Sequence, residues 1–203
     1  MSDRPTRDRY HHGDLKRALV EEAFAMVRSA GHAKFSLRAA ARAVGVDAAA
    51  AYRHFANKDA LLAAVASSAF AELARRMETG MAESDDPVER FVATGRAYVQ
   101  FAIDEPALFR TAFGPRAAER IKTEGVGAQG RNPYELLLDS LSDIRDRLGV
   151  DLEPETAALP AWAAMHGLAH LIVDGNLASD PKDVTDGVVH TILRGLGVHR
   201  ASE

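Results

Sequence analysis

Apolar residues recur along this chain at the three- and four-residue intervals of a helix face, and no segment alternates apolar and polar residues as a strand does. One such face starts after Gly13 and Asp14 and ends at Gly31. A longer one starts after Asn57 and runs unbroken to Gly80. The sequence therefore predicts an all-α fold. The apolar positions are Leu15, Ala18, Leu19, Ala23, Met26, Val27 and Ala30 in the first helix, and Leu61, Leu62, Val65, Ala66, Ala69, Leu73 and Met77 in the second.

Three further helices are predicted from the way they begin. Residues 86–89, 132–135 and 180–183 each place a capping Asp or Asn before a proline, with an acidic residue two positions after the proline. Proline suits the first helical position, and an acid in the first turn interacts favourably with the helix dipole. Between these starts the pattern predicts a short helix near 107–113 and a long one at about 155–177.

The stretch 35–58 reads FSLRAAARAVGVDAAAAYRHFANK and predicts two short helices around a tight turn. Ser36 can cap the first helix, and Gly45 can end it in a left-handed conformation. Asp47 can then cap a second helix that runs through Phe55. Small alanines at 40, 41 and 51 leave room for the two helices to cross closely. This arrangement is typical of a helix-turn-helix.

Charge divides the chain at the same place. Residues 1–60 hold 11 Lys and Arg against 7 Asp and Glu, a net charge of +4, whereas residues 61–203 have a net charge of −8. A positive end that coincides with the helix-turn-helix indicates a surface for phosphates. The helix after Asn57, about 22 residues and more than about 30 Å long, leaves this end and enters a second bundle. We predict a DNA-binding domain at 1–57, with a mobile arm at 1–10, and a second domain at 58–203.

The sequence over roughly residues 10–70 resembles the TetR family of bacterial transcriptional regulators. The second domain is similar to the subgroup with a Trp/His-Gly (WHG) type ligand domain, through Trp162, His166 and Gly167. The segment 10–16, YHHGDLK, carries the same subgroup resemblance. The family motifs are Gly45-Val46, a cap at Asp47, Tyr52-Arg53-His54-Phe55 and Asn57-Lys58-Asp59-Ala60-Leu61-Leu62.

The resemblance implies that the second helix of the motif enters the major groove of double-stranded DNA. Tyr52 and Lys58 would then meet phosphates, and Arg38 would reach a base. Because residues 48–51 are all alanine, much of the sequence preference must come from Arg38, Arg53, His54 and DNA shape. The predicted DNA-binding residues are Ser36, Arg38, Ala48, Ala49, Tyr52, Arg53, His54 and Lys58.

TetR-like proteins hold a small, often apolar effector in the second bundle, and the resemblance implies the same here. Aromatic residues gather before and inside the helix predicted at 155–177; core packing is the alternative explanation for each of them. No sequence motif identifies the effector. The predicted ligand-binding residues are Tyr98, Phe101, Phe109, Phe113, Trp162, Met165, His166 and His170.

A homodimer is expected because one helix-turn-helix covers only a few base pairs, whereas two can bind the halves of a palindrome. Small and aliphatic residues at helical spacing on the last two long helices could form the dimer interface, and an internal core is the alternative. The predicted interface residues are Leu168, Leu171, Ile172, Gly175, Val188, Ile192 and Gly195.

His166, His170 and Asp174 share one helix face, since they are spaced four and four. These side chains could bind Zn²⁺ or Ni²⁺. The histidines could instead anchor the ligand or stay structural, and we expect neither a metal nor a cofactor. The chain has no cysteine and no signal pattern at its start, which favours the cytoplasm. The uncharged run 157–173 contains a proline and is shorter than a membrane span of about 20 residues, so we expect a buried helix and no membrane partner.

The sequence therefore predicts a TetR-type transcriptional regulator that represses by binding a palindromic operator as a homodimer and is released by a small apolar ligand. One alternative is a sequence-tolerant architectural DNA-binding protein without a ligand, which would have a filled second bundle. The other is a helical metal-dependent hydrolase using the His166, His170 and Asp174 face. No nucleophile–base pair accompanies that face, so we expect no enzyme activity.

Overall fold

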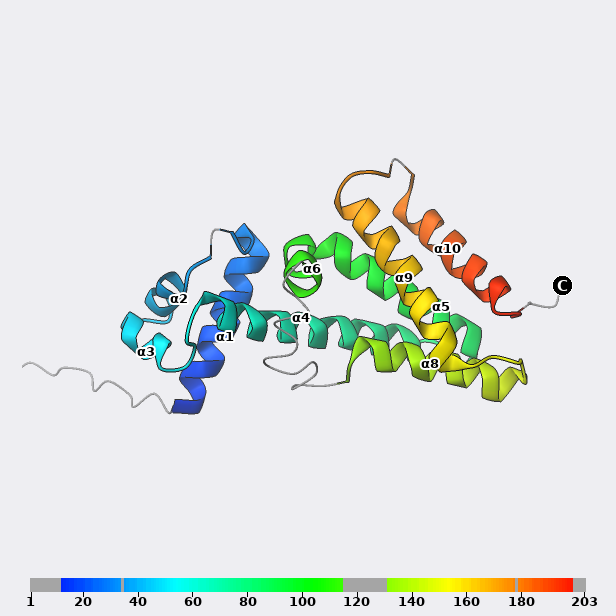
Figure 1. The fold of residues 1–203 in the computed structure, drawn as a ribbon, viewed down its shortest axis with the longest axis horizontal. Helices are drawn as coiled ribbons and strands as arrows, with labels where there is room; N and C mark the ends of the chain where they lie inside the picture. Colours follow the sequence, from blue (N-terminus) through cyan, green and yellow to red (C-terminus); the bar gives the residue numbers. More distant parts are fainter. Residues whose placement is uncertain (1–11, 34, 115–130, 178, 199–203) are drawn as a thin grey trace, which may run out of the picture.

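The computed structural model of the protein describes residues 12–33, 35–114, 131–177 and 179–198. Within these residues the chain is helical and contains no strand, so the predicted all-α fold is confirmed (Figure 1). The arm predicted at 1–10 lies outside the described residues. Figure 1 shows an elongated molecule, with a three-helix unit at one end, a bundle at the other, and one long helix running through both.

The helix-turn-helix forms as its local residues predict. After α1 (His12–Ala30), Ser36 caps α2 (Leu37–Ala43) by accepting the Ala39 N–H at 3.1 Å, and Asp47 caps α3 (Ala48–Tyr52) by accepting the Ala49 N–H at 2.7 Å. Gly45 takes a φ of +75°, which forms the turn between them.

The second helix of the motif is shorter than predicted. It ends at Tyr52, and the amides of His54 and Phe55 both donate to the Ala51 carbonyl in a closing turn. This turn buries Phe55 and frees Asn57 to cap the next helix.

The long helix α4 (Lys58–Met81) has 24 residues, a length of roughly 36 Å, and begins where Asn57 accepts the Ala60 N–H at 2.8 Å. It was predicted to stop at Gly80 but continues through it. A Cβ on Gly80 would lie 3.3 Å from the Cβ of Ala93, so this glycine allows α4 to approach a neighbouring helix closely. Its role is packing rather than helix termination.

The second bundle consists of α5 (Pro87–Asp104), α6 (Pro106–Phe113), α8 (Pro133–Leu148), α9 (Pro154–Val173) and α10 (Pro181–Gly195). The three starts predicted from Asp or Asn followed by proline are confirmed. In each, the side-chain oxygen accepts the amide two residues later, at 2.8 to 2.9 Å. Asn132 and Glu135 complete a reciprocal capping box at the start of α8.

The end of α9 differs from its prediction. The helix stops at Val173 because Gly175 adopts a φ of +71°, and the amides of Gly175 and Asn176 donate back to Ile172 and Leu171. This is a Schellman termination. Asp174 and Gly175 therefore belong to the helix cap instead of to a continuing helix face.

Among the described residues, α9 alone is long and apolar enough to cross a membrane, judged by length and composition only. It begins at Pro154, before the uncharged run, and so reaches 20 residues. The uncharged run 157–173 was judged too short to span a membrane. The whole helix is long enough, so its length does not exclude a span. Its packing against α5, α8 and α10 favours a helix of the bundle.

Two helices connect the halves of the molecule. α4 packs on α1 at one end and on α5, α6 and α8 at the other, and α6 also packs on α1. Figure 1 shows α6 at the junction, between α1 and the rest of the bundle. α4 and α6 therefore both link the second bundle to α1, which packs on α2 of the helix-turn-helix.

Candidate DNA-binding face and ligand cavity

The structure places the predicted DNA-binding side chains around α2, α3 and the start of α4. Figure 1 shows α2 and α3 beside each other at the end of the molecule farthest from α10. Arg38 and Arg53 are exposed, and 46% of Tyr52 is accessible. Ser36 is exposed, with its hydroxyl engaged as the α2 cap. Of the others, Ala49 is exposed, whereas Ala48, His54 and Lys58 are partly buried.

The alanine-rich sequence of this unit follows from its packing. Ala40, Ala41 and Ala51 are completely buried where α2 and α3 cross, so a longer side chain at any of them would separate the helices. Phe35 and Phe55 close the small core. The Nζ atoms of Lys58 and Lys16 lie 5.8 Å and 5.7 Å from the ring centres of Phe35 and Phe55, respectively.

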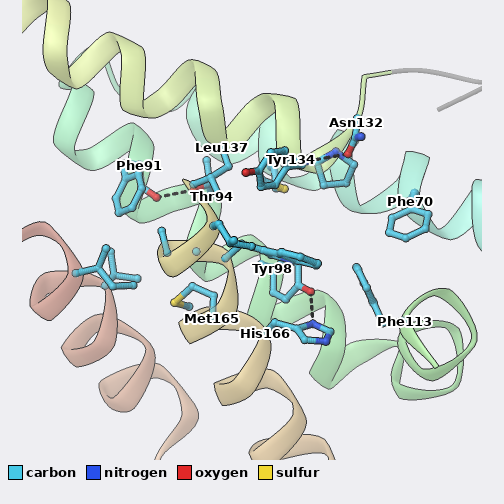
Figure 2. Close-up of a pocket in the computed structure, with 18 of the residues that line it drawn as sticks. Phe70, Phe91, Thr94, Tyr98, Phe113, Asn132, Tyr134, Leu137, Met165 and His166 are labelled. Atoms are coloured by element: carbon cyan, nitrogen blue, oxygen red, sulfur yellow. Dashed lines mark hydrogen bonds between the residues drawn. The ribbon is translucent and has the colours of Figure 1, made fainter. Parts of the chain in front are cut away.

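The second bundle contains a cavity of about 550 Å³, which is within the usual range of small-molecule sites. Helices α4, α5, α6, α8, α9 and α10 all contribute side chains to its wall (Figure 2). Five of the eight residues predicted to bind ligand line it: Tyr98, Phe113, Trp162, Met165 and His166.

Phe101, Phe109 and His170 are not in the lining. Phe101 is fully buried, with the Arg76 guanidinium 5.4 Å from its ring centre. Phe109 is also fully buried and packs against Phe113 at 5.1 Å between ring centres. His170 lies one turn beyond His166 and packs on Phe109 at 5.0 Å. These three residues surround the wall of the cavity instead of forming it.

Other lining residues were missed by sequence reasoning. Apart from Thr94, and from Leu159, which is 58% exposed, they are apolar side chains on inward helix faces. The sequence does indicate such faces, but an inward face of a tightly packed core gives the same pattern. Only the distances between helices decide which apolar residues face an empty volume. The missed residues include Phe70, Met77, Phe91, Thr94, Tyr134, Leu137 and Leu159.

A hydrogen-bonded polar pair lies in this mostly apolar wall. The Tyr98 hydroxyl and the His166 Nδ1 are 2.7 Å apart (Figure 2). Burial raises the pKa of Tyr98, with a side-chain hydrogen bond from Trp162 acting in the opposite direction. Burial also lowers the pKa of His166, assisted by the neighbouring His170. Both side chains are therefore neutral near pH 7, and the tautomer of the imidazole sets which of them donates the shared hydrogen.

The structure does not assemble His166, His170 and Asp174 into a metal site. The Asp174 carboxylate accepts from Arg110 at 3.0 Å, and Arg110 also donates to the Val173 carbonyl. His166 is held by Tyr98. In the described part of the chain, no group of three or more His, Cys, Asp or Glu residues is arranged to hold a metal ion.

A buried carboxylate joins the two halves of the molecule. Glu105 stands between α5 and α6 and is 5% exposed. It accepts hydrogen bonds from the Nε and Nη2 of Arg28 on α1, at 2.8 Å for Nε. Arg76 on α4 approaches it at 3.6 Å and also donates to Asp104 at 2.8 Å. These groups tie α1 and α4 to the first turn of α6, the helix that carries Phe113 into the cavity wall.

The residues predicted for a dimer interface are not equivalent in the structure. Leu168 is buried in the core of the chain, and Ile192 lines the cavity. Leu171 is 45% exposed, Gly175 and Gly195 are exposed, and Ile172 and Val188 are partly buried. The predicted Leu171 belongs to an exposed apolar face on α9 that also contains Leu159, Ala163 and Gly167. Leu159 and Ala163 were missed, although their spacing of four is visible in the sequence.

Two family profiles match this sequence. One, described as bacterial regulatory proteins of the tetR family, covers residues 16–65, and the other, described as a tetracyclin repressor-like C-terminal domain, covers residues 91–196. The second match contains most of α5 and all of α6, α8, α9 and α10. A search of curated proteins returned no match.

Solved structures resemble the whole chain. A protein of unknown function from Rhodococcus sp. RHA1 is 30% identical, with a TM-score of 0.75, covering 93% of this chain and 98% of its own. The TetR family transcriptional regulator PfmR from Thermus thermophilus is 19% identical, with a TM-score of 0.59 and coverages of 87% and 97%. RolR, solved in complex with resorcinol, is 14% identical, with a TM-score of 0.68 and coverages of 95% and 97%.

Proposed function

This chain belongs to the tetR family of bacterial regulatory proteins, and on that premise we propose that it is a cytoplasmic transcriptional repressor released by a small apolar ligand. It binds a palindromic operator as a homodimer. Residues 1–57 form its DNA-binding domain, and residues 58–203 bind the ligand and form the dimer.

DNA binding uses the exposed side chains of α2 and α3, with the positive net charge of the first 60 residues attracting the phosphates. The guanidinium groups of Arg38 and Arg53 can each pair with O6 and N7 of a guanine in the major groove. The aliphatic surface of Ala48 and Ala49 can contact thymine methyl groups. Tyr52 and Lys58 position the unit on the backbone.

Dimerisation uses the outer surface of α9 and α10. The exposed face Leu159, Ala163, Gly167 and Leu171 supports this assignment, because small residues every four positions allow a partner helix to approach closely. Val188 and Gly195 on α10 extend it. In a two-fold dimer these surfaces pair with themselves, which fits a palindromic site.

The observation that carries the proposal is that one helix touches both sites. Phe70 and Met77 of α4 line the cavity, and the same helix starts at Lys58, directly after the helix-turn-helix. A ligand that prefers one packing of the cavity wall therefore shifts the orientation of the two DNA-binding units. RolR, a protein of the same fold, was solved with the small aromatic molecule resorcinol.

The proposal is tested by selecting bound sequences from random duplex DNA with the full-length protein. We expect a palindrome whose half-sites are about 34 Å apart or somewhat more, one dimer per site, and release when the cavity is filled. Binding without sequence preference would contradict the proposal and favour the architectural alternative. The cavity argues against that alternative, since a protein without a ligand has no need of one.

A further inference from the structure

We propose that the ligand of this cavity is an uncharged aromatic molecule with a hydroxyl group, which forms a hydrogen bond with the Tyr98–His166 pair. This inference rests on the proposed function, because it names the chemical class of the effector. It follows from three properties of the wall: its charge, its shape and the one polar pair that the aromatic rings surround.

The described wall of the cavity has no permanently charged side chain. No Asp, Glu, Lys or Arg is among the lining residues that the structure describes. A carboxylate or phosphate entering this space would lose its hydration and find no permanent cation among the described lining residues, which is unfavourable. The described wall therefore favours a neutral ligand over an anionic one.

Five helices bring aromatic rings to the wall besides that of Tyr98. These rings belong to Phe70 of α4, Phe91 of α5, Phe113 of α6, Tyr134 of α8 and Trp162 of α9. Rings gain from edge-to-face and offset contacts with another ring, and the volume is ample, since an apolar cavity of about 150 Å³ already holds one benzene molecule. The rings of the wall therefore favour a ligand that contains an aromatic ring.

The hydroxyl preference comes from Tyr98 and His166. Burial raises the pKa of Tyr98, so its hydroxyl stays protonated, and burial lowers the pKa of His166, so its ring is neutral. Tyr98 and His166 share one hydrogen bond, and in either tautomer of the neutral imidazole the pair keeps hydrogen-bonding capacity, so a ligand hydroxyl, which can both donate and accept, can bond to it. Figure 2 shows this pair between Met165 and Phe113. The Thr94 hydroxyl is occupied, since it donates to the Phe91 carbonyl at 2.7 Å.

The test uses four matched probes on the full-length protein: para-propylphenol, propylbenzene, para-propylbenzoate and phenyltrimethylammonium. Trp162 is the only tryptophan of the chain and lines the cavity, so its emission reports occupancy. We expect para-propylphenol to bind about fivefold tighter than propylbenzene, from one net hydrogen bond. It should bind at least about 100-fold tighter than para-propylbenzoate.

Equal or tighter binding of the benzoate would overturn the inference, as would tightest binding of the ammonium, which would indicate a cation held by ring faces. Absence of any Trp162 response to all four probes would overturn it too. These outcomes need no variant, so they remain decisive even if a substitution disturbs folding.

Tyr98→Phe locates the hydrogen bond, and Tyr134→Phe is the matched control, because both replace a lining tyrosine and keep its ring. We expect only Tyr98→Phe to remove the fivefold preference for the phenol. Retention of that preference in Tyr98→Phe would contradict the assignment.

Operator release is measured separately. If the probes bind in the expected order but DNA stays bound, the proposed function fails and the ligand class stands. If the benzoate releases DNA best, the ligand class fails and the function stands.

Discussion

Single side chains in this protein often serve the fold and the proposed function together. Lys58 is an example, because its ammonium lies over the buried ring of Phe35 while its position at the start of α4 is the one assigned to a phosphate contact. Ser36 is another, since its hydroxyl caps α2 inside the proposed DNA-binding face. Substitutions must therefore separate loss of packing from loss of contact.

Replacing Lys58 with alanine should weaken binding to all DNA sequences to a similar degree. One lost phosphate contact lowers the slope of log affinity against log salt by about 0.9. Lys58→Arg keeps the charge and should keep the slope, whereas Arg53→Ala should relax sequence preference instead. Fluorescence anisotropy over a range of salt concentrations measures each slope. A Lys58→Ala protein with the slope of the parent would remove the phosphate assignment.

The free energy of unfolding should depend on the protonation of His166. Its pKa is lowered in the folded protein from an ordinary value of 6.5, so below that pH the unfolded chain binds the proton first. The contribution is fully present above about pH 6.5 and is lost as the pH falls toward the lowered pKa. Urea unfolding between pH 7.5 and 5.5, roughly one unit either side of the unperturbed histidine pKa, measures it.

His166→Gln is the comparison for this pH dependence, because its amide can donate or accept a hydrogen bond with Tyr98 but does not titrate. We expect the variant to lose stability less steeply in that interval. The same slope in both proteins would show that His166 is not the group responsible.

At the scale of whole helices, glycines set how closely neighbours approach. Gly95 on α5 faces α10 beside the cavity, where an added Cβ would lie 2.8 Å from a Val189 methyl and 3.4 Å from the Met165 Cε. Gly80 has the same function between α4 and α5. In both helices the contact outweighs the poor helix propensity of glycine, about 1 kcal/mol relative to alanine.

Gly95→Ala should therefore destabilise the fold by about 1 kcal/mol, since overpacking of about 1–3 kcal/mol exceeds the gain in helix propensity. Combining it with Val189→Ala should recover part of the loss, with a coupling of about 1–2 kcal/mol. Gly187→Ala on α10 is the control: nothing lies within 4 Å of its added Cβ, so it should stabilise. The midpoints of urea unfolding measure these stabilities. Equal stability of Gly95→Ala and Gly187→Ala would refute the close contact at Gly95.

Across the whole molecule, the proposed signal must pass from the cavity to the helix-turn-helix through few contacts. α6 is one route, since its Phe113 lines the cavity and its first turn adjoins Glu105, which Arg28 of α1 holds. The pair joins residues 77 positions apart in the chain. Because Arg28 is 58% exposed, removing the carboxylate charge leaves it solvated, so the fold should tolerate the change.

Glu105→Gln should therefore reduce the coupling between ligand and DNA severalfold while leaving each binding event measurable. The readout is the ratio of operator affinities with and without para-propylphenol, with Trp162 emission confirming occupancy. Arg96→Gln is the matched control, because Arg96 makes a similar two-bond pair with Asp186 inside the second bundle. If both variants lower the ratio equally, the junction has no special part in coupling.

The sequence by itself determined where the helices begin and what kind of fold they build. Ser36, Asp47, Asn57, Asp86, Asn132 and Asp180 each satisfy an amide two or three residues away, so their signals are local and can be predicted. The helix-turn-helix follows from the same local residues, with Gly45 between them.

Only the tertiary structure decided the rest, because it depends on distances between residues far apart in the chain. It made Gly80 a packing residue and Gly175 a terminator, although both are glycines at the end of an apolar pattern. It left Tyr98, Trp162 and His166 facing an empty volume while enclosing Phe101 and Phe109 in the core. Helix periodicity marks a face as apolar, but the approach of neighbouring helices determines whether that face meets another side chain or a cavity.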